Sequence, residues 1–220
     1  MKFIPYGNHY LDKKDYNAVL KSLKFPILTK GPEVELFEKN ICRKVGSKYA
    51  LAVSSCTAGL HLAIMTLSKD KRKKIITSPI SFVSTSNTII LNNLKPEFAD
   101  INKETLNIDP YYIERKFKKR NDIRAIIPVH LTGLAAHSDK IYKFAKKKKI
   151  NVIEDAAHSF GGKYKCGAKI GSCKYSDMTI FSFHPVKSIT TLEGGVITTN
   201  SKKLYRELRS LRNHGIEKKK

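Results

Sequence analysis

From about residue 45, the chain alternates short apolar runs with segments whose apolar residues recur at helical spacing. Strands that alternate with helices form βαβ units, and strands covered by helices on both faces are apolar throughout. We therefore predict an α/β fold with three layers, α/β/α, built on a mixed sheet whose strands are mostly parallel. The predicted strands are 49–53, 74–77, 96–100, 123–129, 150–154, 178–182 and 195–199. The predicted helices are 57–67, 81–91, 110–120, 138–148 and 202–211, and Ser138 is the expected N-cap of the fourth.

Polar side chains gather directly after several of the predicted strands. The carboxyl ends of neighbouring parallel strands meet at one edge of a sheet, and ligands bind beyond that edge. We therefore expect one binding site that draws on these segments. They are 54–57, 78–82, 130–133, 155–158 and 184–191.

Two of these segments contain an acid and an amine that together suit one cofactor. Asp155 follows the apolar run 150–154, and Lys187 lies in a polar turn after the run 178–182. Pyridoxal phosphate (PLP) needs a lysine amine, which forms a Schiff base, and a carboxylate that keeps the pyridine nitrogen protonated. Taken alone, Asp155 could also bind a metal or cap the strand, and Lys187 could be one of many surface lysines. The pair, at the ends of two strands, favours a PLP site.

Four further features fit the same cofactor, and three of them also have a simpler explanation. The helix start at 55–57 can bind a phosphate through backbone N–H groups, or its hydroxyls can cap the helix. Phe82 can stack on a flat ring or pack in the core. His158 can reach the cofactor ring or simply be a polar residue of the following helix. Ser182 can donate to phosphate. The glycine-rich motifs of dinucleotide-binding proteins and of P-loop proteins are absent from the sequence.

The 42 lysine and arginine residues outnumber the 19 acidic residues, which gives a formal net charge of +23. Such a chain can bind nucleic acid. However, aromatic residues are not interleaved with the lysine runs, and the sequence contains no nucleic-acid-binding motif. We expect lysine-rich helix faces in contact with solvent and an attraction for phosphate-bearing substrates, without a nucleic-acid partner.

The lack of targeting signals and the cysteine spacing indicate the compartment of the protein and the state of its thiols. No apolar run approaches the ~20 residues of a membrane span, and the N-terminus lacks the long apolar segment of a secretory signal. We therefore expect a cytoplasmic protein without a membrane partner. The cysteines form no close C-x-x-C pair, so we expect four free thiols and no metal site. They are Cys42, Cys56, Cys166 and Cys173.

Four stretches of the sequence resemble the DegT/DnrJ/EryC1/StrS family of sugar aminotransferases, which are PLP enzymes of fold type I. They are 54–63, 77–87, 154–162 and 176–195. The last contains Phe-His-Pro-Val-Lys-Ser-Ile-Thr-Thr, which is especially similar to the branch that aminates a UDP-linked 4-keto-6-deoxy sugar on the pseudaminic acid route. The stretches 4–7 and 28–31 resemble this branch too.

The resemblance implies roles for individual residues. Lys187 would be the catalytic Schiff-base lysine, and Asp155 would pair with the pyridine nitrogen. The other implied cofactor contacts are Thr57, Ala58 and Ser182 to the phosphate, Phe82 on the ring face and His158 near the phenolic oxygen. The implied contacts to the sugar nucleotide are Tyr6, Leu28 and Thr29. In the implied reaction, a homodimer moves an amino group, typically from glutamate, to C4 of the sugar.

The resemblance also implies how the chain is divided. Residues 1–30 would form an N-terminal segment on the substrate side, and residues 31–220 a PLP-binding large domain of the aspartate aminotransferase type. Members of the family are nearly twice as long, so we expect this domain to be incomplete and the small C-terminal domain to be missing. The alternatives are an inactive, truncated remnant of such an enzyme and a basic nucleic-acid-binding protein. A related dehydratase is disfavoured, because those enzymes replace the lysine at position 187 with histidine.

Overall fold

The computed structural model describes residues 3–5, 7–29, 31–118 and 122–216. Its strands form one seven-stranded sheet in the order β1-β7-β6-β5-β4-β2-β3. β7 is antiparallel to both of its neighbours, and the other neighbouring pairs are parallel. The strands are β1 (Tyr49–Val53), β2 (Lys74–Thr77), β3 (Lys95–Phe98), β4 (Ile123–Ile127), β5 (Asn151–Asp155), β6 (Met178–Ser182) and β7 (Gly195–Thr199). The mostly parallel, mixed sheet predicted from the sequence is therefore confirmed.

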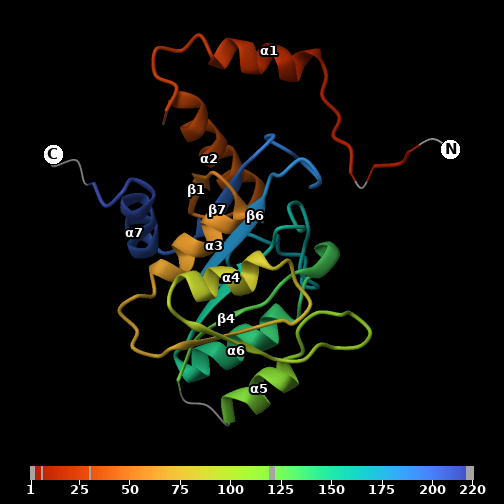
Figure 1. Cartoon of the computed structure of the whole chain (residues 1–220), viewed down its shortest axis with the longest axis vertical. Helices are drawn as coiled ribbons and strands as arrows, with labels where there is room; N and C mark the ends of the chain where they lie inside the picture. Colours follow the sequence, from red (N-terminus) through yellow and green to blue (C-terminus); the bar gives the residue numbers. More distant parts are fainter. Residues whose placement is uncertain (1–2, 6, 30, 119–121, 217–220) are drawn as a thin grey trace.

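Helices cover both faces of this sheet (Figure 1). The α-helices are α1 (Lys13–Ser22), α2 (Pro32–Val45), α3 (Cys56–Met65), α4 (Ser84–Leu91), α5 (Pro110–Lys118), α6 (Ser138–Lys148) and α7 (Lys202–Arg212). α3, α4 and α7 bury Leu60, Ile89 and Leu208 in one core cluster. α5 and α6 bury Ile113 and Ile141 in a second cluster on the opposite face, and α2 contributes to a third cluster. These clusters confirm the predicted three-layer α/β/α arrangement.

Strand burial follows the position of each strand in the sheet. Every residue of β4, β6 and β7 is buried, as expected for central strands with helices on both faces. β3 is an edge strand and leaves Lys95 and Phe98 exposed. Pro96 removes one backbone donor from this edge, which hinders pairing with another chain.

Ser138 is not the N-cap of α6, contrary to the prediction. His137 occupies that position without a side-chain capping bond, and Ser138 lies inside the first turn. The Ser138 hydroxyl donates instead to Glu154 Oε1 at 2.8 Å. A buried carboxylate accepts more strongly than a neutral backbone group would, because it is charged.

Several element boundaries also differ from the prediction. The helix expected over 81–91 begins at Ser84, because residues 78–83 form the loop after β2. β4 ends at Ile127, directly before Pro128, which has no N–H for a strand ladder. The other predicted strands and helices agree with the structure to within two residues at each end.

Two helices precede the segment in which elements were predicted. α2 has a proline in its first turn and ends at Gly46, whose φ of 83° is typical of a helix stop. α1 buries none of its residues and stands away from the body of the molecule (Figure 1). None of the helices in the described ranges is both long enough and apolar enough to cross a membrane.

Candidate active site

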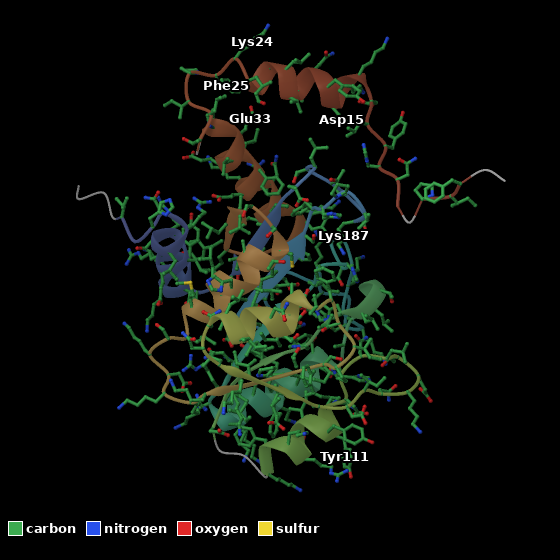
Figure 2. All side chains as sticks on the ribbon, viewed as in Figure 1. Asp15, Lys24, Phe25, Glu33, Tyr111 and Lys187 are labelled. Atoms are coloured by element: carbon green, nitrogen blue, oxygen red, sulfur yellow. The ribbon has the colours of Figure 1, made fainter. Side chains whose placement is uncertain are left out.

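A pocket of about 550 Å³ opens at the carboxyl edge of the sheet, among the segments that follow β1, β2, β4, β5 and β6. The sequence predicted a site at this edge. The predicted site residues that line the pocket are Thr57, Phe82, Asp155, His158, Ser182 and Lys187. Figure 2 shows Lys187 in the upper part of the body, on the side of the N-terminal arm.

Asp155 is the last residue of β5 and is 3% exposed. Its Oδ2 accepts a hydrogen bond from Thr85 Oγ1 at 2.7 Å, and its Oδ1 accepts one from the Ala157 amide at 3.2 Å. Thr85 is fully buried in α4. Because each carboxylate oxygen has a donor, Asp155 is held in one orientation at the pocket.

The start of α3 forms a second wall. Ser55 is the N-cap, and its Oγ accepts the Ala58 amide at 3.1 Å. The amides of Cys56 and Thr57 belong to the first turn and have no acceptor within the helix. Both residues line the pocket, so a bound anion could satisfy these amides. Ala58 does not line the pocket and its amide already has an acceptor, so its predicted phosphate contact stays a prediction.

β7 passes very close to this helix start. A Cβ atom on Gly195 would lie 2.5 Å from the carbonyl carbon of Ser55 and 2.7 Å from the nitrogen of Cys56. Only glycine allows such an approach of two backbones. The hairpin of β6 and β7 is therefore packed directly against the N-terminus of α3.

Lys187 lies in the loop of this hairpin and is half-buried. Phe183 closes the neck of the loop, because its amide donates to Gly194 O at 2.9 Å and its carbonyl accepts the Thr191 amide at 3.0 Å. The Lys187 amide donates to His184 O at 2.9 Å. The lysine is thus carried by a short turn whose base is fixed to the sheet.

Charges in the pocket influence the titration of two neighbours. Burial lowers the pKa of His158 below its ordinary 6.5, and the positive charge of Lys187 lowers it further, against the opposing effect of Asp155. Burial raises the pKa of the Cys56 thiol well above its usual value; Asp155 adds to this effect and Lys187 opposes it. At neutral pH the pocket therefore presents a neutral imidazole and a neutral thiol.

A second buried acid lies behind the pocket. Glu154 precedes the pocket acid in β5, so its side chain points to the other face of the sheet. Its carboxylate accepts hydrogen bonds from Ser138 at 2.8 Å and Tyr164 at 2.7 Å, and His130 Nε2 lies 3.2 Å away without hydrogen-bond geometry. Burial alone would raise the pKa of Glu154, but His130 and these hydroxyl groups outweigh burial and hold the pKa at about 2. Glu154 is therefore ionised and joins α6 and the loop after β5 to the sheet.

The predicted sugar-nucleotide residues are not brought to the pocket by the described part of the chain. Leu28 and Thr29 are exposed and do not line it. Tyr6 lies outside the described residues. The predicted substrate contacts of all three residues stay predictions.

Three residues that line or support the pocket received no individual role from the sequence. His130 and Glu193 line it, and Glu193 Oε1 lies 3.7 Å from His184 Nε2. His130 belongs to a polar segment expected at a strand end, so the strand-end rule located it. Thr85 lies in a run of Ser, Thr and Asn that is typical of a solvent-exposed helix start, so no local signal distinguishes it from its neighbours.

The pocket can accommodate the three reactive parts of PLP. It offers the Lys187 amine for an aldehyde, the Asp155 carboxylate for a ring nitrogen and the amides of α3 for a phosphate. Phe82 is 69% exposed and lines the pocket. In the described ranges, no group of three or more His, Cys, Asp or Glu side chains is placed to hold a metal ion.

Known proteins are similar to this chain in both sequence and fold. The UDP-4-amino-4,6-dideoxy-N-acetyl-beta-L-altrosamine transaminase of Campylobacter jejuni is 43% identical over 217 residues, which are 98% of this chain and 56% of that protein. The structure of Helicobacter pylori PseC, an aminotransferase involved in the biosynthesis of pseudoaminic acid, matches with a TM-score of 0.93 and 34% identity. The match covers 100% of this chain and 58% of PseC. The chain therefore spans a little over half the length of these relatives.

A third similar structure was solved in the PMP form. The sugar aminotransferase Spr1654 of Streptococcus pneumoniae, solved in its PMP form, matches with a TM-score of 0.90 and 25% identity over 98% of this chain and 58% of that one. Residues 9–220 match the model of one protein family. The chain belongs to the DegT/DnrJ/EryC1/StrS aminotransferase family.

Proposed function

We propose that the protein is a PLP-dependent aminotransferase that acts on a nucleotide-linked sugar. The observation that carries this proposal is the meeting of Lys187, Asp155 and the start of α3 in one pocket. The similarity to the C. jejuni transaminase supports a finer proposal. In it, the amino group comes from glutamate and goes to C4 of a UDP-linked 4-keto-6-deoxy sugar.

The cofactor would be held by residues at or after the ends of four strands, β1, β2, β5 and β6. Lys187 would bind it through Nζ, Asp155 would face its ring nitrogen, and Phe82 would cover one ring face. Thr57 and Ser182 would donate to its phosphate. The geometry supports this assignment because all five side chains line the same pocket.

Bound PLP supplies an electron sink for the carbanion that forms when the substrate loses a proton. Lys187 would hold that proton on Nζ and deliver it, which is general base and general acid catalysis by one amine. Thr85 would keep Asp155 in position through the hydrogen bond of 2.7 Å. His158 would be neutral at pH 7 and would donate or accept a hydrogen bond at the phenolic oxygen.

The substrate side is proposed from the resemblance alone. Residues 1–30, with Tyr6, Leu28 and Thr29, would contact the sugar nucleotide, and residues 31–220 would bind the cofactor. The net charge of +23 favours a substrate that carries a diphosphate. We further propose a homodimer that works in the cytoplasm.

A second candidate is a polypeptide that binds the cofactor without transaminating. The coverage of 56% to 58% of the relatives favours this candidate, because residues outside the matched part can contribute to their sites. It differs from the first proposal in turnover and shares the cofactor linkage to Lys187, so one experiment can separate the two.

The test combines cofactor trapping with turnover. The purified chain is incubated with PLP, reduced with borohydride and mapped by mass spectrometry, with Lys187→Ala as the matched control. We expect a visible absorbance band and one adduct, on Lys187. A second portion of the PLP-loaded chain, kept unreduced, receives glutamate and a UDP-4-ketosugar. An adduct with an amino sugar product supports the aminotransferase, an adduct without product supports the second candidate, and an adduct on other lysines contradicts both.

A further inference from the structure

Gly7, in the N-terminal segment, contacts the turn that carries Lys187. A Cβ atom on Gly7 would lie 2.7 Å from Val186 Cγ1 and 3.1 Å from Val186 Cβ. Real Cβ atoms do not approach other carbon atoms this closely, so the bare backbone of Gly7 already packs against the valine. Val186 lines the pocket and directly precedes Lys187. The contact thus joins the first residues of the chain to the centre of the site.

Within the described residues, the hydrogen bonds and the ion pair at His184, Val186 and Lys187 all stay inside the hairpin of β6 and β7. The Val186 amide lies 3.4 Å from His184 Nδ1, and the Lys187 amide donates to His184 O. His184 Nε2 in turn faces Glu193 of the same hairpin. Gly7 therefore adds a contact from outside the hairpin to a turn whose polar contacts are local.

A valine side chain that is pushed tends to move its own backbone. Its branched Cβ leaves few χ1 rotamers, so Val186 cannot swing aside without moving its backbone. A methyl group added at position 7 would push on Val186, and Lys187 would shift with it. Figure 2 shows the lysine on the side of the body that faces the N-terminal arm, which agrees with this path.

We propose that Gly7 is a positioning residue: its backbone packs against Val186 and sets the place of Lys187 in the pocket. The proposal deepens the function proposed above and rests on it for the role of the lysine. The contact itself does not depend on a cofactor. The N-terminal segment would then contribute to the site through its backbone, in addition to any substrate contact made by its side chains.

The test uses Gly7→Ala, with Asn8→Ala as the control at the next, exposed position. Overpacking by one methyl group commonly shifts a local equilibrium by about fivefold or more. We expect Gly7→Ala to slow borohydride trapping of PLP at Lys187 by about fivefold and to speed amide exchange of residues 184–190 in the cofactor-free chain by a similar factor. Asn8→Ala should leave both rates unchanged.

Rescue makes the test specific. Val186→Ala removes Cγ1, the atom 2.7 Å from the new methyl group, and leaves only Cβ at 3.1 Å and the backbone. The double variant should therefore trap PLP within about twofold of Val186→Ala alone. Circular dichroism checks that all variants are folded. An unchanged Gly7→Ala variant, or a double variant as slow as Gly7→Ala, would overturn the proposal. If the parent chain never links PLP to Lys187, the proposed function fails, while amide exchange still decides whether Gly7 holds the turn.

Discussion

The hydroxyl of Thr85 lies 2.7 Å from Oδ2 of Asp155, in the buried space between α4 and the end of β5. Thr85 Oγ1 is also 3.0 Å from the carbonyl of Phe82, but its single proton favours the shorter contact to the carboxylate. The Thr85 amide donates to the same carbonyl at 3.1 Å. One helix residue therefore links the pocket acid to the loop that carries Phe82. The pocket depends on α4 as much as on the sheet.

Replacing Thr85 with valine keeps the shape and removes the donor. A hydrogen bond to a charged group contributes about 1.5 to 3 kcal/mol, so Thr85→Val should weaken PLP binding by at least about tenfold. Thr85→Ser keeps a hydroxyl and should stay close to the parent chain. Absorbance titration with PLP gives both dissociation constants. Equal affinity of Thr85→Val and the parent would show that Asp155 does not need this donor.

The titration of His158 should report on Lys187. Because burial and the Lys187 charge lower the pKa of His158, NMR of its Cε1–H should give a midpoint below 6.5, and Lys187→Met should raise that midpoint. The same shift makes the stability of the fold depend on pH. The unfolded chain binds the proton more readily, so the contribution of His158 to stability falls as the pH drops through 6.5. His158→Gln identifies the resonance, and a midpoint that does not respond to Lys187→Met contradicts the proposed proximity.

Glu154 should make the fold sensitive to acid. Its pKa is lowered from 4.5 to about 2, so it stabilises the folded chain above pH 4.5, and this contribution is lost as the pH falls towards 2. The corresponding free energy is on the order of 3 kcal/mol. Denaturant unfolding from pH 7 to pH 3 should therefore show a smaller loss of stability in Glu154→Gln than in the parent chain. Glu104→Gln, on an exposed residue, serves as the control and should follow the parent curve.

A methyl group at Gly195 should damage the fold and the phosphate end of the pocket together. The new Cβ would meet backbone atoms of Ser55 and Cys56, which cannot move aside as a side chain can. We expect Gly195→Ala to lower the free energy of unfolding by about 3 kcal/mol or more and to abolish PLP binding. Gly167→Ala is the comparison, since Gly167 has a φ of 82° but open space around it. That variant should lose only about 1 kcal/mol and keep the pocket.

The sequence predicts the layers of this fold well and the contacts of the site only in part. The runs 178–182 and 195–199 were predicted at their observed bounds, because short runs of mainly apolar and β-branched residues are typical of buried strands. The place of β7 between β1 and β6 has no such signature, since strand pairing depends on residues far apart in the chain. Ser138 shows the same limit. Its position suggested a cap, and only the folded chain brings Glu154 to its hydroxyl.

The position of β7 also has a consequence for the order in which the protein is made. β1, which precedes the proposed phosphate-binding helix, pairs with no other strand until β7 has been synthesised, and β7 is the last strand of the sheet. Contacts between such distant segments form slowly, because a long loop must close before they stabilise the chain. On the ribosome, β1 and α3 therefore lack β7 as a packing partner until residue 199 has left the exit tunnel. The close packing of Gly195 against the start of α3 therefore forms only after β7 has emerged.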